Sequence, residues 1–334
     1  MDKYTEILEI SWLTRLRNAV AALVFGSLFF GIGFVMLKNG EKSHAKITSG
    51  LQRTIPKIVA EPQANNTDIF YLTDSIQSSK PLLQDSLFNI QVQGLKLYRK
   101  VYTWQWFERR SQKNTRQPLG GTKAEITYSY DKGWVSNFCS HSEPNTLHEY
   151  NYNSPFFKYK EGHSNPPQIY TSTLVANDHQ AKIGTYTIAS QLCNAVNNFT
   201  LLDLKTQKLD KGILDTFNYA ETPWYNGFGT SSDFFCTKKS PMNRGEKTSS
   251  IFIGQGSPQA PIVGDTRIEY WYVPENIYTV VGLKNENTIE TFQDDSLFIR
   301  AADNTLALGH FGLIFQGKKE LAEISKDLYN ESNF

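Results

Sequence analysis

The residues best suited to nucleophilic chemistry are Cys139, His141 and His148, which lie together in one polar stretch. A cysteine nucleophile needs a base within hydrogen-bond reach, and the two must be close in space rather than in sequence. The spacing therefore gives only weak support for a cysteine hydrolase. We favour a small buried thiol beside a loop histidine, because free cysteines commonly pack as small apolar side chains. Cys193 is interpreted as a core residue.

Sequence signatures of other catalytic sites are missing from the chain. It has no G-x-S-x-G elbow, H-E-x-x-H pair, P-loop or complete G-x-G-x-x-G fingerprint. Gly254-Gln255-Gly256 begins like the fingerprint but lacks its third glycine and its βαβ context. Asp294–Asp295 is interpreted as a turn rather than a metal site. The 3 cysteines and 6 histidines are dispersed, which excludes a disulfide framework and a zinc ribbon. We expect no enzyme, and no catalytic, cofactor-binding or metal-binding residue.

One stretch interleaves basic and aromatic side chains, as on surfaces that stack single-stranded nucleic acid. Its basic residues are Arg99, Lys100, Arg109 and Arg110, and its aromatic residues are Tyr98, Tyr102, Trp104 and Trp106. The alternative is a strand with packed aromatic side chains and solvated charges. We favour the strand, because Glu108 interrupts the run and 34 basic against 33 acidic residues give a net charge of only +1. We therefore expect no nucleic-acid partner, and buried side chains at Trp104 and Trp106.

One segment determines where the rest of the chain lies relative to a membrane. It is the apolar stretch Ala19–Leu37, which has no charged residue. Arg17 precedes it, Lys38 follows it, and Trp12 lies where an interfacial aromatic anchor is expected. A helix of about 20 apolar residues matches a bilayer core and satisfies its own backbone in lipid. The segment therefore predicts a retained transmembrane helix, with the lipid bilayer as a partner.

Two alternatives to a retained anchor fit less well. A cleavable signal peptide has an apolar region of about 7–15 residues and a small-residue cleavage site. A buried core helix of this length would rarely lack a polar position. Orientation stays open, because the basic residues on the two sides nearly balance and long domains are translocated largely regardless of charge. These residues are Lys3, Arg15 and Arg17 before the segment and Lys38, Lys42, Lys46 and Arg53 after it.

The remaining chain has a folded composition, since 40% of residues are apolar, 13% aromatic and 20% charged. Ala124–Tyr130 alternates apolar and polar side chains and predicts a half-buried strand. Leu95–Phe107 is apolar on both faces, which predicts a strand covered on both sides. Arg110–Lys123, which contains Pro118 and two glycines, is predicted as the loop of a long hairpin.

Helices and short strands follow the hairpin. One helix is predicted from the spacing of Ile188, Leu192, Val196 and Phe199, and a loop over residues 221–262. Strands are predicted over Arg267–Val273, Ile277–Leu283, Ile289–Phe292, Leu297–Arg300 and Thr305–Leu308. Leu321, Ile324 and Leu328 predict an amphipathic helix. The expected fold class is α+β, with an N-terminal transmembrane helix followed by a mainly antiparallel, β-rich domain that has a few helices.

The expected organisation has five parts. They are a short N-terminus (1–18), the transmembrane helix (19–37), a membrane-proximal linker or helix (38–66), an α+β domain (67–316) and an amphipathic C-terminal helix (317–334). Small residues recur four apart in the transmembrane segment, at Ala22–Gly26 and Ser27–Gly31, with Gly33 following. This spacing lets helices approach closely in lipid and predicts a homo-oligomer, although glycine is also common in lone membrane helices.

The order of several short motifs resembles that of a known family. The hairpin carries Val101, Trp104-Gln105-Trp106, Glu108, Tyr128-Ser129-Tyr130 and Trp134. Further motifs are Asn165-Pro166, Ile183-Gly184, Asn198-Phe199, Val263-Gly264-Asp265-Thr266-Arg267 and the apolar segment Asn304–Gly309. Together they resemble the LUMA family (transmembrane protein 43), over about residues 12–325.

The resemblance implies an integral membrane protein with a cytoplasmic N-terminus and a large luminal or periplasmic domain. It implies a bacterial inner membrane, or the endoplasmic reticulum and inner nuclear membrane in a eukaryote. The family carries further membrane spans after the domain, whereas this sequence stops at Phe334, so we expect a single-pass or truncated form. We expect a non-catalytic scaffold that binds itself and other membrane proteins. The alternatives are an envelope cysteine hydrolase and a ligand-sensing domain.

Overall fold

The computed structural model describes most of the chain, which divides into two compact units. The described residues are 3–10, 12–116, 121–135, 147–151, 158, 161–218, 247–293 and 310–331. Unit 1 comprises Met1–Lys38, Val101–Ser172 and Asp215–Ile268, and unit 2 comprises Asn39–Lys100, Thr173–Leu214 and Glu269–Phe334. Each unit combines three separate stretches of chain, so neither is built from local sequence alone.

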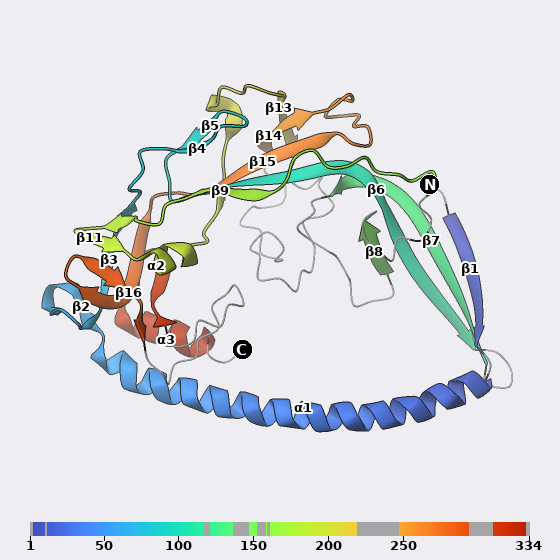
Figure 1. The fold of residues 1–334 in the computed structure, drawn as a ribbon, viewed down its shortest axis with the longest axis horizontal. Helices are drawn as coiled ribbons and strands as arrows, with labels where there is room; N and C mark the ends of the chain where they lie inside the picture. Colours follow the sequence, from blue (N-terminus) through green and yellow to red (C-terminus); the bar gives the residue numbers. More distant parts are fainter. Residues whose placement is uncertain are drawn as a thin grey trace. The chain divides into compact units, whose positions relative to one another are not determined.

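One uninterrupted helix, α1 (Trp12–Thr54), contains the predicted transmembrane segment (Figure 1). Within it, Leu16–Asn39 is 24 residues long, with a mean hydropathy of 2.4, which is long and apolar enough to cross a membrane. Its large apolar side chains are uncovered, and Phe30 is 79% exposed. The helix expected after the span is the continuation of α1, which ends at Thr54 and is followed by the single 3-10 turn η1 (Ile55–Lys57).

The N-terminal residues form a strand, which the sequence analysis did not predict for residues 1–18. Strand β1 (Lys3–Ile10) pairs antiparallel with β7 (Thr122–Val135) over eight residue pairs, from Lys3↔Ser129 to Ile10↔Thr122. Its pattern of alternating side chains is short, and its partner lies more than 110 residues away in sequence. Local pattern alone therefore could not identify it.

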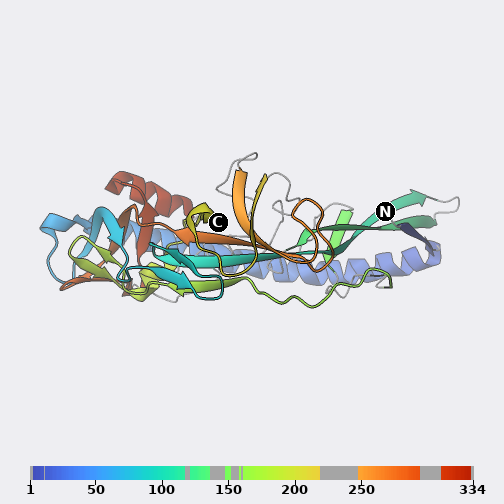
Figure 2. The same ribbon diagram turned by 90° about the horizontal axis from the view of Figure 1, so that it is seen from above.

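The predicted hairpin is present and is longer than expected (Figure 2). Strand β6 (Lys96–Arg116) pairs antiparallel with β7 from Thr103↔Val135 to Arg116↔Thr122. The loop predicted over Arg110–Lys123 is therefore wrong for most of its length. Polar residues there satisfy their backbone groups across the ladder rather than by burial, and Gln112 Nε2 donates to Asn114 Oδ1 at 2.9 Å along one face.

The larger sheet has nine strands, six of which follow one another in the order β1-β7-β6-β15-β14-β13. Strand β15 (Thr266–Val273) confirms a predicted strand, β13 is Ile213–Asn218, and β8 (Leu147–Asn151) pairs with β6. The loop predicted over residues 221–262 is wrong at β14 (Lys247–Ile253). Its sequence KTSSIFI lacks alternation because Thr248, Ser249, Ser250 and Ile251 are all buried. The predicted strands at 297–300 and 305–308 lie outside the described residues.

Unit 2 contains a seven-stranded sheet of order β2-β3-β10-β11-β17-β16-β20, in which β3 also pairs with β16. The strands are β2 (Val59–Ala60), β3 (Ile69–Gln77), β10 (Lys182–Ile183), β11 (Tyr186–Ile188), β17 (Thr288–Glu290), β16 (Ile277–Asn285) and β20 (Leu313–Gln316). The β3–β16 ladder closes a ring of strands through β10, β11 and β17, and β2 and β20 remain at the ends of the strand order. Most pairings are antiparallel, and β2–β3 and β11–β17 are parallel.

Short elements complete the two units. They are the pair β4 (Leu83–Asp85) and β5 (Ile90–Val92), β9 (Thr173–Asn177), β12 (Thr200–Leu201), the pair β18 (Phe292–Gln293) and β19 (His310–Phe311), and the 3-10 turns η2 (Glu61–Gln63) and η4 (Leu204–Thr206). The helix predicted around residues 188–199 is reduced to α2 (Ser190–Ala195). Ile188, Val196 and Phe199 are buried, but they lie in a strand and a loop rather than in a helix.

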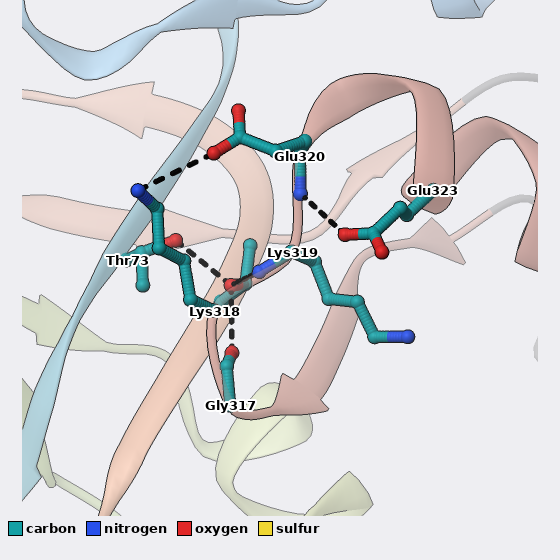
Figure 3. A network of polar contacts seen from close by, with 7 residues as sticks. Thr73, Gly317, Lys318, Lys319, Glu320 and Glu323 are labelled. Carbon is teal, nitrogen blue, oxygen red and sulfur yellow. Dashed lines mark hydrogen bonds and ion pairs between the residues drawn. The ribbon is translucent and has the colours of Figure 1, made fainter.

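The predicted amphipathic helix is confirmed as α3 (Leu321–Glu331), which packs through the buried Ile324. Figure 3 shows the polar contacts at its start. The Thr279 hydroxyl donates to the Gly317 carbonyl at 2.9 Å and accepts from the Lys319 backbone N–H at 2.9 Å. The Glu323 carboxylate accepts from the Glu320 backbone N–H at 3.0 Å, the reciprocal half of a capping box. The confirmed fold class is an apolar N-terminal helix followed by mainly antiparallel β structure with few helices.

Candidate functional site

Most of the residues considered for nucleophilic or metal chemistry lie outside the described part of the chain. Cys139, His141 and Asp294–Asp295 lie outside the described residues. His148 is in β8, opposite Arg110 of β6. Within the described part of the chain, no three His, Cys, Asp or Glu side chains are placed to hold a metal ion.

Cys193 is a structural thiol. It is buried in α2, and its Sγ donates to the Ile188 carbonyl oxygen at 3.6 Å. Burial raises the pKa of this thiol to about 11, so it stays protonated near neutral pH. A reactive cysteine requires the opposite shift, which agrees with its interpretation as a core residue.

The basic and aromatic run at the start of β6 is packed inside unit 2. Arg99 Nη1 lies 2.6 Å from Asp85 Oδ2, and the same oxygen accepts a hydrogen bond from the Tyr270 hydroxyl at 2.6 Å. Burial, and then the hydrogen bond to Asp85, raises the pKa of Tyr270. Tyr98 and Lys100 are buried as well. These side chains form a core and not an open surface for stacking bases.

Trp104 and Trp106 are half-buried, so the prediction of burial is met only in part. The Trp104 ring makes an edge contact with Trp134, with centroids 5.3 Å apart. The Trp106 ring makes an edge contact with His163 at 4.8 Å and lies under the Lys132 ammonium at 4.4 Å. One face of β6 therefore packs against its neighbours, while the long rings keep an outer edge in solvent.

A buried polar cluster at the middle of the hairpin was missed by the sequence analysis. Glu108, with no exposed surface, accepts hydrogen bonds from the Tyr130 hydroxyl and, at 2.8 Å, from the Lys158 backbone N–H. His163 stacks on the Tyr130 ring at 4.0 Å, and Asn165 Oδ1 accepts from the Trp106 backbone N–H at 2.8 Å. The cluster holds one buried carboxyl group and ties Lys158, His163 and Asn165 to the hairpin.

The glycine pair that begins like a phosphate-binding fingerprint binds a carboxylate of its own chain. Asp265 accepts hydrogen bonds from the backbone N–H groups of Gln255 at 3.0 Å, Gly256 at 3.2 Å and Ile262 at 2.7 Å. A Cβ on Gly254 would lie 2.1 Å from Asp265 Oδ1, and one on Gly256 2.5 Å from Oδ2. The glycines are needed for this close approach, and the loop offers no free anion site.

The N-terminal strand makes specific side-chain contacts on β7. The Tyr128 hydroxyl donates to Glu6 Oε2 at 3.3 Å, and Lys158 Nζ lies 3.2 Å from Glu6 Oε1. The Tyr4 and Tyr130 rings meet edge to face at 5.8 Å. Sequence patterns did not indicate this site, because its residues come from three distant segments.

The described part of the chain leaves the apolar stretch of α1 uncovered. A Cβ added at Gly26, Gly31 or Gly33 would meet nothing within 4 Å. Ser27 Oγ donates to the Leu23 carbonyl of its own helix at 2.8 Å, which satisfies this hydroxyl within an apolar surface. Among the described residues, α1 is the one helix able to cross a membrane.

Comparison with known proteins supports the membrane assignment. The family described as Transmembrane protein 43 matches residues 103–334. The chain is 22% identical to the human Transmembrane protein 43 over 317 residues, which cover 90% of this chain and 66% of that protein. It is 22% identical to the mouse protein over 326 residues, 93% of this chain and 68% of that protein. A Drosophila melanogaster homolog is 25% identical over 146 residues, 43% of this chain and 35% of that protein.

The chain spans about two thirds of the length of the curated mammalian relatives that it matches. No solved structure matches it.

Proposed function

The chain belongs to the transmembrane protein 43 family, and from that premise we propose that it is a membrane-anchored scaffold without catalytic activity. In this proposal α1 holds the protein in the bilayer, and the β-rich units bind further copies and other membrane proteins. The observation that carries it is the uncovered apolar stretch Leu16–Asn39. In a water-soluble protein such a surface would be buried, whereas in a bilayer its apolar side chains can stay in contact with lipid.

Self-association is proposed to run through the small residues of α1. At about 100° per residue, Ala22, Gly26 and Gly33 share one face of the helix, and Gly31 lies about 140° from Gly26. Small side chains let two helix backbones approach closely, and packing then drives association in lipid. Because both faces are open in this structure, either can receive a second helix.

The test is the mass of the full chain in mild detergent over a range of concentrations. We expect assemblies of at least two 38.0 kDa chains. Gly26→Leu should weaken association about tenfold, or about 1.4 kcal/mol, if that face is the contact, because the larger side chain keeps the two helix backbones apart. Gly31→Leu tests the opposite face. The Gly26→Leu, Gly31→Leu double variant changes both faces, and Ile32→Phe, about 100° from Gly31 and about 120° from Gly26, enlarges a third face as the control. A wild type that is monomeric at every concentration contradicts the scaffold.

The proposed orientation places residues 41–334 away from the cytoplasm. This orientation is supported by the resemblance of the chain to its family. The nearly balanced basic residues on the two sides of the span do not oppose this orientation. The membrane is proposed to be a bacterial inner membrane, or the endoplasmic reticulum and inner nuclear membrane in a eukaryote. No contact among the described residues favours the cysteine-hydrolase or ligand-sensing alternatives over this scaffold.

A further inference from the structure

Strand β1 and helix α1 are almost continuous in the chain. The β1–β7 ladder ends at Ile10↔Thr122, and α1 begins at Trp12. The position of β1 is therefore tied to the N-terminal end of α1, whichever side of a membrane that end occupies.

A membrane crossing by α1 separates β1 from β7. If Leu16–Asn39 spans the bilayer, β1 stays on the near side and Asn39 emerges on the far side. From Asn39 to Thr122 the described residues contain no second span, and only residues 117–120 of that stretch lie outside them, which is too short to cross. Strand β7 therefore lies on the far side with Asn39. The ladder and the crossing exclude each other within one chain.

We propose that the outer edge of β7 is a docking site for an extended strand of a partner protein, with side chains in the order aromatic, acidic and aliphatic at alternate positions. Residues 3–10 fill this edge only while both ends of α1 lie on one side of the membrane. When α1 crosses, the edge is open to the partner. This inference rests on the proposed membrane crossing and names the kind of partner that the scaffold binds.

The chemistry of the site defines the strand that it accepts. Tyr4, Glu6 and Leu8 lie on one face of β1, opposite Tyr128, Ile126 and Ala124 of β7. The acidic position receives the Tyr128 hydroxyl and the Lys158 ammonium, and the aromatic position packs on Tyr130. Main-chain pairing supplies affinity and the alternate side chains supply selectivity, as in other strand-addition sites.

An open β7 edge also needs an occupant for a physical reason. Its inner face carries Ala124, Ile126 and Tyr128, which are all buried in the β1-paired structure. Removing β1 leaves the backbone of β7 from Thr122 to Ser129 unpaired along this edge, which is a template for pairing with another strand. No proline interrupts β7 between Thr122 and Val135.

The first experiment measures sidedness and pairing in the full chain reconstituted into sealed vesicles, with Cys139, Cys193 and Cys236 replaced by alanine. Reaction of Lys3→Cys and Lys113→Cys with an impermeant maleimide shows whether β1 and the β6–β7 hairpin lie on the same side of the membrane. Disulfide formation between Thr5→Cys and Thr127→Cys, which are register partners, reports the ladder within one chain. The control is Thr5→Cys with Lys123→Cys, about 13 Å off register.

The second experiment adds a synthetic peptide with the sequence of residues 3–10, carrying Thr5→Cys, to the side on which the domain is exposed. We expect it to form a disulfide with Thr127→Cys and not with Lys123→Cys. A peptide that also carries Glu6→Lys should be captured about fivefold less, because the contact with Lys158 becomes repulsive.

The outcomes separate the two proposals. Labelling of positions 3 and 113 from the same side, with the Thr5–Thr127 disulfide formed, contradicts the crossing and with it the open edge. Labelling from opposite sides with no register-specific capture of the peptide overturns the docking site alone. Opposite sides, no disulfide within the chain and register-specific capture support both.

Discussion

Helix α1 and the β-rich units use the same side chains in opposite ways. Phe30 of α1 is 79% exposed, whereas Phe70 of β3 is fully buried. The glycines of the two regions differ in the same way. A Cβ added at Gly33 would meet nothing within 4 Å, whereas one added at Gly254 would collide with the Asp265 carboxylate. The lesson is that the two regions are built for two solvents. Burial by the protein's own chain stabilises the β structure, and burial by lipid is required for α1.

The largest expected difference comes from truncating one phenylalanine in each region. Phe70→Ala should lower the free energy of unfolding of the β structure by about 3–5 kcal/mol, because it leaves a cavity in a packed core. Phe30→Ala should leave that free energy unchanged, since it removes no contact within the protein. Denaturant unfolding in detergent, followed by tryptophan fluorescence, measures both. Equal effects would remove the distinction between the regions.

A matched glycine pair sharpens the comparison. Gly254→Ala should cost about 1–3 kcal/mol, because the new Cβ would collide with Asp265 and displace the loop that it organises. Gly33→Ala should leave the unfolding of the β structure unchanged, since the added Cβ meets nothing within 4 Å. Denaturant unfolding followed by tryptophan fluorescence measures the effect of both substitutions. A stable Gly254→Ala protein would show that the Asp265 loop is not held by this close approach.

The third and smallest expected difference between the two regions is how an acidic side chain in each affects stability at low pH. Asp178 accepts hydrogen bonds from the hydroxyls of Ser79 at 2.7 Å and Ser78 at 2.9 Å, and from the Gln180 backbone N–H at 3.0 Å. Burial alone would raise the pKa of this carboxyl, but the hydrogen bonds, led by that of Ser79, hold it below its usual value. The stability that it contributes is complete above the unfolded pKa of about 3.9 and is lost as pH falls through the lower folded pKa.

We therefore expect Asp178→Asn to be less stable than wild type near neutral pH, with the difference narrowing as the solution becomes acidic. Denaturant midpoints from pH 7 down to pH 2 measure this narrowing. Glu41→Gln, at an exposed position of α1, is the control and should follow the wild type throughout. A constant gap between Asp178→Asn and wild type at every pH would contradict the role given to the ionised carboxyl.

Local sequence patterns predicted the elements that contact a single kind of environment along their length. The apolar run of α1 and the 3.6-residue period of α3 each depend on one neighbour type, lipid or core, and both are confirmed. The strands β15 and β16 are confirmed for the same reason, because both are covered by the core along most of their length.

The rest depends on contacts between distant segments. Strand β1 exists because β7 receives it, and Glu108 is buried because Tyr130 and residue 158 supply its donors. The polar end of β6 has loop composition and becomes a strand through its ladder with β7. No site residue was predicted from the sequence, and the strand-docking edge is visible only when β1, α1 and β7 are considered together.

The central claim is that α1 crosses the membrane and leaves residues 41–334 on the far side. Its most direct test is labelling of Lys113→Cys with a membrane-impermeant maleimide in intact cells, in the background without native cysteines. For a bacterial inner-membrane protein, we predict labelling from outside without permeabilisation, while Lys3→Cys reacts only after permeabilisation. Labelling of Lys113→Cys only after permeabilisation, or of both positions from one side, would contradict the account.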